Sequence, residues 1–208
     1  MASALLPAFP VIGSAQAAAP TDLVSEAGSL RAGEFVWQPG RVTAGEMDIV
    51  VSIPLQRAYV YRGGTLIGVS TVSTGRAGHE TPAGRFNILE KRQEHYSNLY
   101  NNAPMPFMQR LTWDGIALHA GQIPGRPASH GCVRLPLAFA RHLFEATQVG
   151  AAVHIIHFSP SAEEALALVS PARAYAAISG QETDVPAREQ LSANSASGFL
   201  GRHTRLTY

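Results

Sequence analysis

Cysteine is almost absent from this sequence, since Cys132 is the only one among 208 residues. A single cysteine excludes an intramolecular disulfide and leaves its thiol no internal cysteine with which to oxidise. Charge of either sign is also sparse: 16 Lys and Arg against 15 Asp and Glu give a net charge of +1. Because no basic run is present, electrostatic binding to nucleic acid is disfavoured.

Long hydrophobic runs are missing as well, so the sequence predicts no integral membrane span. The hydrophobic content is nevertheless 46% and the charged content 15%, which is typical of a globular protein. A chain of this length predicts one domain of ordinary size with appendages at its ends.

The first residues resemble a signal sequence in part. Residues 4–13 are largely apolar, and Ala15-Gln16-Ala17 has the small-x-small form of a signal-peptidase site. A positively charged n-region is missing, and Pro7 and Pro10 interrupt the apolar stretch. Residues 1–19 are therefore either part of a signal peptide or a flexible arm. The sequence favours export, with which a lone, unpaired thiol agrees.

Residues 47–158 carry a β pattern with one helix. A hairpin is expected around Gly63-Gly64, a second around Asp114-Gly115, and a helix where apolar residues follow helical spacing after Cys132. The expected strands are 48–53, 57–61, 65–72, 85–89, 107–112, 116–119 and 152–158, and the expected helix is 137–147. The sequence predicts a mainly β fold with one or two helices (α+β).

The two flanks differ from this region. Residues 20–46 mix glycine, proline and polar residues and are interpreted as a lead-in. Ser161 to Glu164 form a capping-box pattern, which predicts a short helix before a loose polar end. The predicted organisation is an N-terminal segment of 1–19, a lead-in of 20–46, a domain of 47–158 and an extension of 159–208.

Cys132 lies in a loop of small and polar residues, and His119 ends an apolar strand shortly before it. A thiol is a useful nucleophile only as the thiolate, which a nearby imidazole can generate by taking the proton. Loops on a rigid scaffold are also where catalysis concentrates. The pattern favours a catalytic nucleophile over the alternative of an inert buried thiol.

Residues 47–158 resemble the catalytic domain of YkuD-type L,D-transpeptidases. The resemblance depends on segments in the same order: residues 48–52 and 56–61, 73–75, 81–86, and His119 followed by Ser129-His130-Gly131-Cys132-Val133-Arg134. The last segment is the most specific. Two departures exist: nine residues separate His119 from Ser129, fewer than in many members, and Arg134 stands where the strict signature has Asn.

The resemblance implies a mixed β-sandwich with a helix after the cysteine loop, and a transferase of peptidoglycan biosynthesis in the periplasm or cell wall. Cys132 would attack a stem tetrapeptide after its third residue, with His119 as general base oriented by a carbonyl such as that of Ala120. The N–H groups of Gly131 and Cys132 would form the oxyanion hole.

The acyl group would then pass to an amine, giving a 3→3 cross-link or attachment to protein, and so contribute to cell wall biogenesis and cell shape. Water as acceptor would make the protein an L,D-carboxypeptidase instead. Peptidoglycan stem peptides are the expected partners. No cofactor and no metal are expected, and the oligomeric state stays open.

Several neighbours have two interpretations. His130 either tunes the thiolate or shapes the loop, and Ser129 is expected to hydrogen-bond within the loop. Arg134 either binds a substrate carboxylate bidentately or makes a buried structural pair. Residues 101–108 resemble a wall of the substrate cleft or place Met and Phe in the core. The candidate substrate-binding residues are Arg134, Met105, Phe107 and Tyr100, with His95 and Ser97 on weaker grounds.

The sequence leaves two alternative functions open. Cys132, His119, His130 and His95 could form a zinc site, although neither a Cys-x-x-Cys pair nor a His-Glu-x-x-His helix is present. A non-catalytic peptidoglycan-binding module with the same fold is the other rival.

Overall fold

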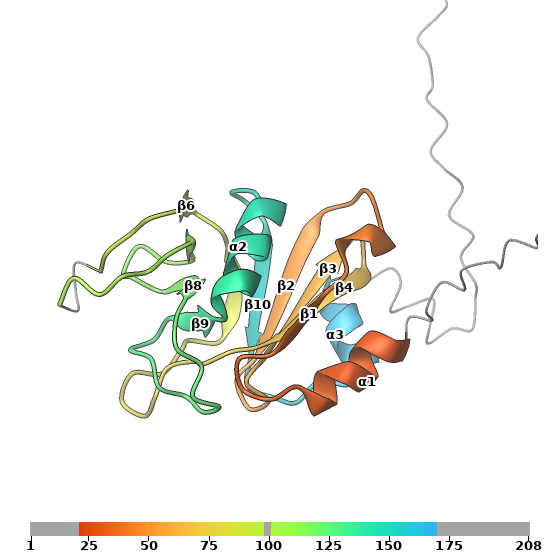
Figure 1. Cartoon of the computed structure of the whole chain (residues 1–208), viewed down its shortest axis with the longest axis horizontal. Helices are drawn as coiled ribbons and strands as arrows, with labels where there is room; N and C mark the ends of the chain where they lie inside the picture. Colours follow the sequence, from red (N-terminus) through yellow and green to blue (C-terminus); the bar gives the residue numbers. More distant parts are fainter. Residues whose placement is uncertain (1–20, 98–100, 170–208) are drawn as a thin grey trace, which may run out of the picture.

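The computed structural model describes residues 21–97 and 101–169, which form two β-sheets with a helix between them (Figure 1). The six-stranded sheet has the order β1-β4-β3-β2-β10-β5, and the four-stranded sheet has the order β6-β7-β8-β9. The strands of the larger sheet are β1 (Phe35–Trp37), β2 (Met47–Ser52), β3 (Arg57–Arg62), β4 (Thr65–Thr71), β5 (Gly84–Asn87) and β10 (Ala152–Ile156). Those of the smaller sheet are β6 (Glu90–Arg92), β7 (Met108–Arg110), β8 (Ala117–Ala120) and β9 (Val133–Leu135).

Both sheets are mixed, because β2 pairs with β10 and β8 pairs with β9 in parallel while their other neighbours are antiparallel. Both predicted hairpins form, with β3 and β4 joined through Gly63 and Gly64, and β7 and β8 through Gly115. The prediction of a mainly β, mixed sandwich with few helices is confirmed.

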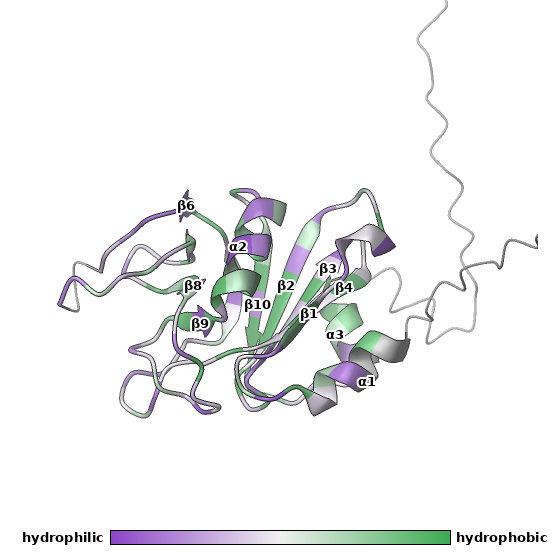
Figure 2. Ribbon diagram, in the orientation of Figure 1, coloured by the Kyte–Doolittle hydropathy of each residue, from purple (hydrophilic) through white to green (hydrophobic). Residues whose placement is uncertain are grey.

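The main core lies where the two sheets and helix α2 (Leu137–Ala146) meet. Alternate residues of β2 and β10 turn toward α2, which buries Phe139, Ala140 and Leu143 against both sheets. Figure 2 shows hydrophobic residues along β2 and β10 and a mixed character on α2. Such burial of apolar side chains supplies the main stabilisation of the sandwich. Helix α2 begins directly after β9, so the core also fixes the loop that precedes β9.

The segment expected to be a lead-in is part of the fold. It contains helix α1 (Thr21–Ser29), strand β1 and the 3-10 helix η1 (Pro39–Arg41), and β1 is the edge strand of the larger sheet. The indole of Trp37 stacks on the His142 ring of α2 with 5.8 Å between centroids. A three-residue strand is too short to show a period-two pattern, which is why β1 could not be predicted from the sequence.

Helix α3 (Ala162–Val169) begins at the capping box that the sequence predicts. The Glu164 N–H donates to Ser161 Oγ at 3.2 Å, and the Ser161 N–H donates to Glu164 Oε2 at 2.7 Å. Ala165 of this helix packs against Val50, Tyr61 and Ile156 on the outer face of the larger sheet. Within the two described ranges, no helix combines the length and apolarity needed to cross a membrane.

Candidate active site

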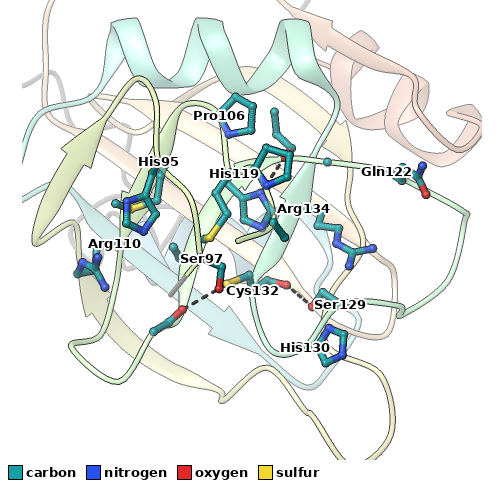
Figure 3. Close-up of a pocket in the computed structure, with 18 of the residues that line it drawn as sticks. His95, Ser97, Pro106, Arg110, His119, Gln122, Ser129, His130, Cys132 and Arg134 are labelled. Carbon is teal, nitrogen blue, oxygen red and sulfur yellow. Dashed lines mark hydrogen bonds between the residues drawn. The ribbon is translucent and has the colours of Figure 1, made fainter. Parts of the chain in front are cut away.

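A pocket of about 480 Å³ opens on the smaller sheet and contains both Cys132 and His119 (Figure 3). Its walls are formed by the connection between β6 and β7, by strands β7 and β8, and by the loop that leads into β9. The lining residues are His95, Ser97, Ala103, Pro104, Met105, Pro106, Met108, Arg110, Gly115, Ala117, His119, Ala120, Gly121, Gln122, Ser129, His130, Cys132, Arg134 and Leu137.

Cys132 lies in the middle of the pocket, half-buried, directly before β9. Its Sγ donates a hydrogen bond to the carbonyl oxygen of Gly115, 3.3 Å away. Burial raises the pKa of the Cys132 thiol, and the Ala117 N–H and the charges of Arg134 and Arg110 oppose this increase without cancelling it. The resting sulfur is therefore a neutral thiol.

His119 lies on β8 and is only 8% exposed. Its Nδ1 is 2.8 Å from the carbonyl oxygen of Ala120, which requires the proton to be on Nδ1 and leaves Nε2 as the proton acceptor. Burial is the main cause that lowers the pKa of His119 to about 4; the hydrogen bond to Ala120 opposes this decrease, and the nearby Arg134 charge adds to it. The imidazole is thus neutral at physiological pH.

These two pKa shifts point to the same chemistry. Since burial disfavours both the thiolate of Cys132 and the imidazolium of His119, the site does not hold a preformed ion pair. It holds a neutral thiol and a neutral base instead. That arrangement suits general-base catalysis, in which the proton leaves sulfur as the sulfur attacks.

Ser129 holds the loop around Cys132. Its Oγ accepts the Gly131 N–H at 3.1 Å and donates to the carbonyl oxygen of Cys132 at 2.5 Å. Ser129 is buried, with 1% of its surface exposed. It therefore acts as a hydrogen-bonding residue within the loop, as its position in the sequence predicts.

The same contact changes the expected oxyanion hole. The Gly131 N–H was one of the two predicted donors, but in this structure it is occupied by Ser129 Oγ. Gly131 also has a φ of +116°, and a Cβ there would meet Ile116 Cδ1 at 2.8 Å. The sharp turn of the loop therefore requires glycine at position 131. The N–H of Cys132 is the member of the predicted pair that this bond leaves available.

The two supporting residues, His130 and Arg134, have different positions relative to the pocket. His130 is exposed, lies below Ser129 and away from His119 in Figure 3, and packs its ring on His79 with 4.9 Å between centroids. This placement favours a role in shaping the loop. Arg134 lines the pocket, and its methylene groups pack within reach of Gly121. Among the described residues it makes no ion pair, so the predicted buried pairing is not found there.

The three other candidate substrate contacts have different positions. Met105 lines the pocket and is 8% exposed. Phe107 does not line it: its ring lies edge-on to Phe144 of α2 and packs against the main core. Phe107 has a φ of +57°, and the chain turns there between the pocket wall and β7. Tyr100 lies outside the described residues.

Sequence reasoning missed several residues of the site. Arg110 and Gly115 line the pocket, and Arg110 is paired with Glu90 at 2.7 Å. Thr81 and Ser73 hydrogen-bond to backbone carbonyls of the cysteine loop. Their segments belong to the resemblance noted above, but sequence order does not reveal which backbone group each hydroxyl contacts.

The four side chains of the alternative zinc site do not gather as metal ligands would. His130 lies away from His119 in Figure 3, and Cys132 Sγ is directed at Gly115. Across residues 21–97 and 101–169, no three His, Cys, Asp or Glu side chains form a group that could hold a metal ion.

Comparison with solved structures shows the fold. The L,D-transpeptidase of Stackebrandtia nassauensis aligns with a TM-score of 0.52 and 25% identity over 69% of each chain. An L,D-transpeptidase of Mycobacterium tuberculosis H37Rv aligns with a TM-score of 0.51 and 22% identity over 53% of this chain and 57% of its own. The alignment therefore spans little more than half of the mycobacterial protein.

A search of curated proteins gives no match. The family model of the L,D-transpeptidase catalytic domain (YkuD) matches residues 46–155, which is more than half of the chain and includes the pocket's Cys132 and His119. The chain belongs to the YkuD family of L,D-transpeptidase catalytic domains.

Proposed function

We propose that this protein is a cysteine-dependent L,D-transpeptidase that acts on peptidoglycan stem tetrapeptides. The observation that supports this most directly is that one pocket contains both the Cys132 thiol and a neutral His119 whose Nδ1 is held by the Ala120 carbonyl. Family membership supports the reaction class, and a neutral thiol and a neutral imidazole in one pocket support the roles of nucleophile and base.

In the first half-reaction, Nε2 of His119 takes the thiol proton while Sγ of Cys132 attacks the carbonyl carbon after the third residue of the stem. The new S–C bond moves the carbonyl π electrons onto oxygen, where the Cys132 N–H donates to the oxyanion. When the oxyanion collapses, the C–N bond breaks. The nitrogen of the departing D-alanine takes the proton from His119, which leaves a thioester on Cys132.

In the second half-reaction, an amine of another stem peptide attacks the thioester and gives its proton to His119. Collapse of this second oxyanion breaks the S–C bond and returns the proton to Cys132. The products are a 3→3 cross-link, or a stem attached to protein where the amine belongs to a protein, and the free enzyme. If water replaces the amine, the same steps make a tripeptide, and the protein is an L,D-carboxypeptidase.

Arg134 is the proposed contact for a substrate carboxylate. It lines the pocket beside His119, and among the described residues it has no carboxylate partner of its own, whereas Arg110 is already paired with Glu90. A planar guanidinium binds a carboxylate through two parallel hydrogen bonds. Met105 supplies apolar surface to the same pocket.

Because the proposed substrate is peptidoglycan, which is cross-linked outside the cytoplasm, we propose that the protein works in the periplasm or cell wall. The signal-like features of residues 1–19 agree with this location. Fusing the full N-terminus to a reporter that is active only after export tests it, and a reporter that stays inactive would reject this location.

The central experiment incubates the purified full chain with a disaccharide-tetrapeptide and follows both protein and products by mass spectrometry. We expect an acyl adduct on Cys132, loss of D-alanine, and cross-linked dimers. Cys132→Ala should give none of the three. Tripeptides without dimers would identify the carboxypeptidase. If the wild-type protein gives none of the three and both proteins bind peptidoglycan equally, the result would instead favour a non-catalytic binding module.

A further inference from the structure

The loop that carries Cys132 rests on an earlier segment, residues 73–81, in which residues 73–75 and Thr81 are buried. The two segments exchange several hydrogen bonds: Ser73 Oγ donates to the Arg126 carbonyl at 2.8 Å, and the Ser129 N–H donates to the Thr74 carbonyl at 3.0 Å. Thr81 makes the contact nearest the nucleophile. Its Oγ1 donates to the carbonyl oxygen of Gly131 at 2.7 Å.

The Thr81 hydroxyl is also fixed by a second hydrogen bond. Its Oγ1 accepts the Gly75 N–H at 2.8 Å, and the residue is 2% exposed. Gly75 must be glycine for this contact, because a Cβ there would lie 2.7 Å from the Thr81 nitrogen. A hydroxyl with both its donor and its acceptor bonds fixed cannot rotate freely, so Thr81 presents its proton in one direction.

The carbonyl that Thr81 contacts is directly linked to the backbone N–H of Cys132. It belongs to the peptide unit that joins Gly131 to Cys132, and the N–H of that unit is the Cys132 N–H that the proposed mechanism uses for the oxyanion. A peptide unit is planar, so fixing the direction of its C=O also fixes the opposite direction of its N–H. Hydrogen bonds in such a chain also polarise one another, which makes the terminal N–H a better donor.

We propose that Thr81 is a positioning residue for acyl transfer, because its hydroxyl orients the Gly131–Cys132 peptide so that the Cys132 N–H stabilises the oxyanion. The inference rests on the proposed function and deepens it. Thr81 itself touches neither the substrate nor the sulfur. It acts at the step in which the S–C bond forms and the carbonyl electrons move onto oxygen, by fixing the donor before charge develops.

The experiment compares two reactions of the same sulfur in the full chain. Acylation by the disaccharide-tetrapeptide passes through an oxyanion, whereas alkylation by iodoacetamide replaces iodide on carbon and forms none. Thr81→Val removes the hydroxyl at nearly constant shape. We expect it to slow acylation about 10- to 100-fold and to leave alkylation within about twofold. Thr81→Ser keeps the hydroxyl and should stay within about threefold of the wild type in both reactions.

Ser73→Ala is the matched control, since it removes a buried hydroxyl bond from the same segment to the same loop, but at Arg126. It should leave the ratio of acylation to alkylation unchanged. Thr81→Ala provides a second variant without the hydroxyl if Thr81→Val does not fold. An unchanged ratio of acylation to alkylation in Thr81→Val and Thr81→Ala, or an equal loss of that ratio in Ser73→Ala, would overturn the inference.

Failure of the proposed function has a different result. A wild-type protein that iodoacetamide alkylates but that no tetrapeptide acylates would reject the function, and the role of Thr81 with it. If the wild type is acylated but Thr81→Val is acylated equally fast, only the role of Thr81 is rejected.

Discussion

The Sγ of Cys132 donates its hydrogen bond to the carbonyl oxygen of Gly115, 3.3 Å away, at the turn between β7 and β8. The proton that His119 would receive in the proposed mechanism is therefore directed at a backbone carbonyl in the resting site. Because a carbonyl oxygen repels a thiolate, this contact also agrees with a neutral resting thiol, which burial of Cys132 favours through its raised pKa.

Gly115 has a φ of +117°, a backbone conformation that favours glycine. We expect Gly115→Ala to lower the free energy of unfolding by about 1–2 kcal/mol and to displace the carbonyl that contacts Cys132. Urea denaturation measures the first effect, and the rate of alkylation by iodoacetamide measures the second. Gly150→Ala is the control, since Gly150 also has a positive φ, +96°, but does not line the pocket that contains Cys132. An equal alkylation rate in both variants would show that the turn does not control the thiol.

The pH dependence of acylation follows from His119. Because burial lowers its pKa to about 4, the imidazole stays neutral and able to accept a proton throughout the mildly acidic range. The value of kcat/KM should therefore hold as the pH falls below 6.5 and decline only as the pH approaches about 4. Acylation measured from pH 3.5 to 8 tests this. A decline centred near pH 6.5 would mean that the imidazole is solvated in the free enzyme, contrary to its burial.

Gln56 links the larger sheet to the segment beneath the cysteine loop. Its Nε2 donates to Thr74 Oγ1 at 2.7 Å, and its Oε1 accepts the Thr74 N–H at 3.0 Å. Gln56→Leu leaves that buried N–H without its acceptor, so we expect a loss of about 1–3 kcal/mol in the free energy of unfolding. Gln148→Leu makes the same chemical change at an exposed site and should cost less than about 0.5 kcal/mol. Equal values for the two variants would contradict a structural role for Gln56.

The packing of β1 against β4 can be tested at Gly68. A Cβ at Gly68 would lie 2.5 Å from Cε3 of Trp37, so Gly68→Ala should destabilise the protein by about 1–3 kcal/mol through overpacking. Trp37→Leu removes the obstructing ring, so Gly68→Ala should cost much less in that background. A double-mutant cycle from urea denaturation gives the coupling. Additive effects would show that Trp37 does not pack on Gly68.

The sequence predicted the local elements well and the long-range contacts poorly. The hairpins, α2 and the capping box of α3 depend on neighbouring residues, so turn glycines and apolar spacing are sufficient to find them. The parallel pairs of β2 with β10 and of β8 with β9 join distant segments, which no local pattern specifies.

The same distinction applies to the site. Cys132, His119 and Ala120 could be named from residue types and the family resemblance, and the structure places Cys132 and His119 in one pocket. The pattern did not indicate that Ser129 occupies the Gly131 N–H, or that Phe107 turns toward Phe144. Both depend on backbone direction at residues with positive φ or in a tight loop, and sequence spacing carries no such information.

The last prediction concerns Arg134. If its guanidinium binds a substrate carboxylate, Arg134→Gln should raise KM for the tetrapeptide about tenfold and change kcat little, because the contact is the same in the ground state and the transition state. A tetrapeptide with an amidated terminal carboxyl should show a much smaller difference between the two proteins. Arg126→Gln is the control, since Arg126 is exposed on the same loop and does not line the pocket. Equal KM values for Arg134→Gln and wild type with the free carboxylate would remove Arg134 from substrate binding.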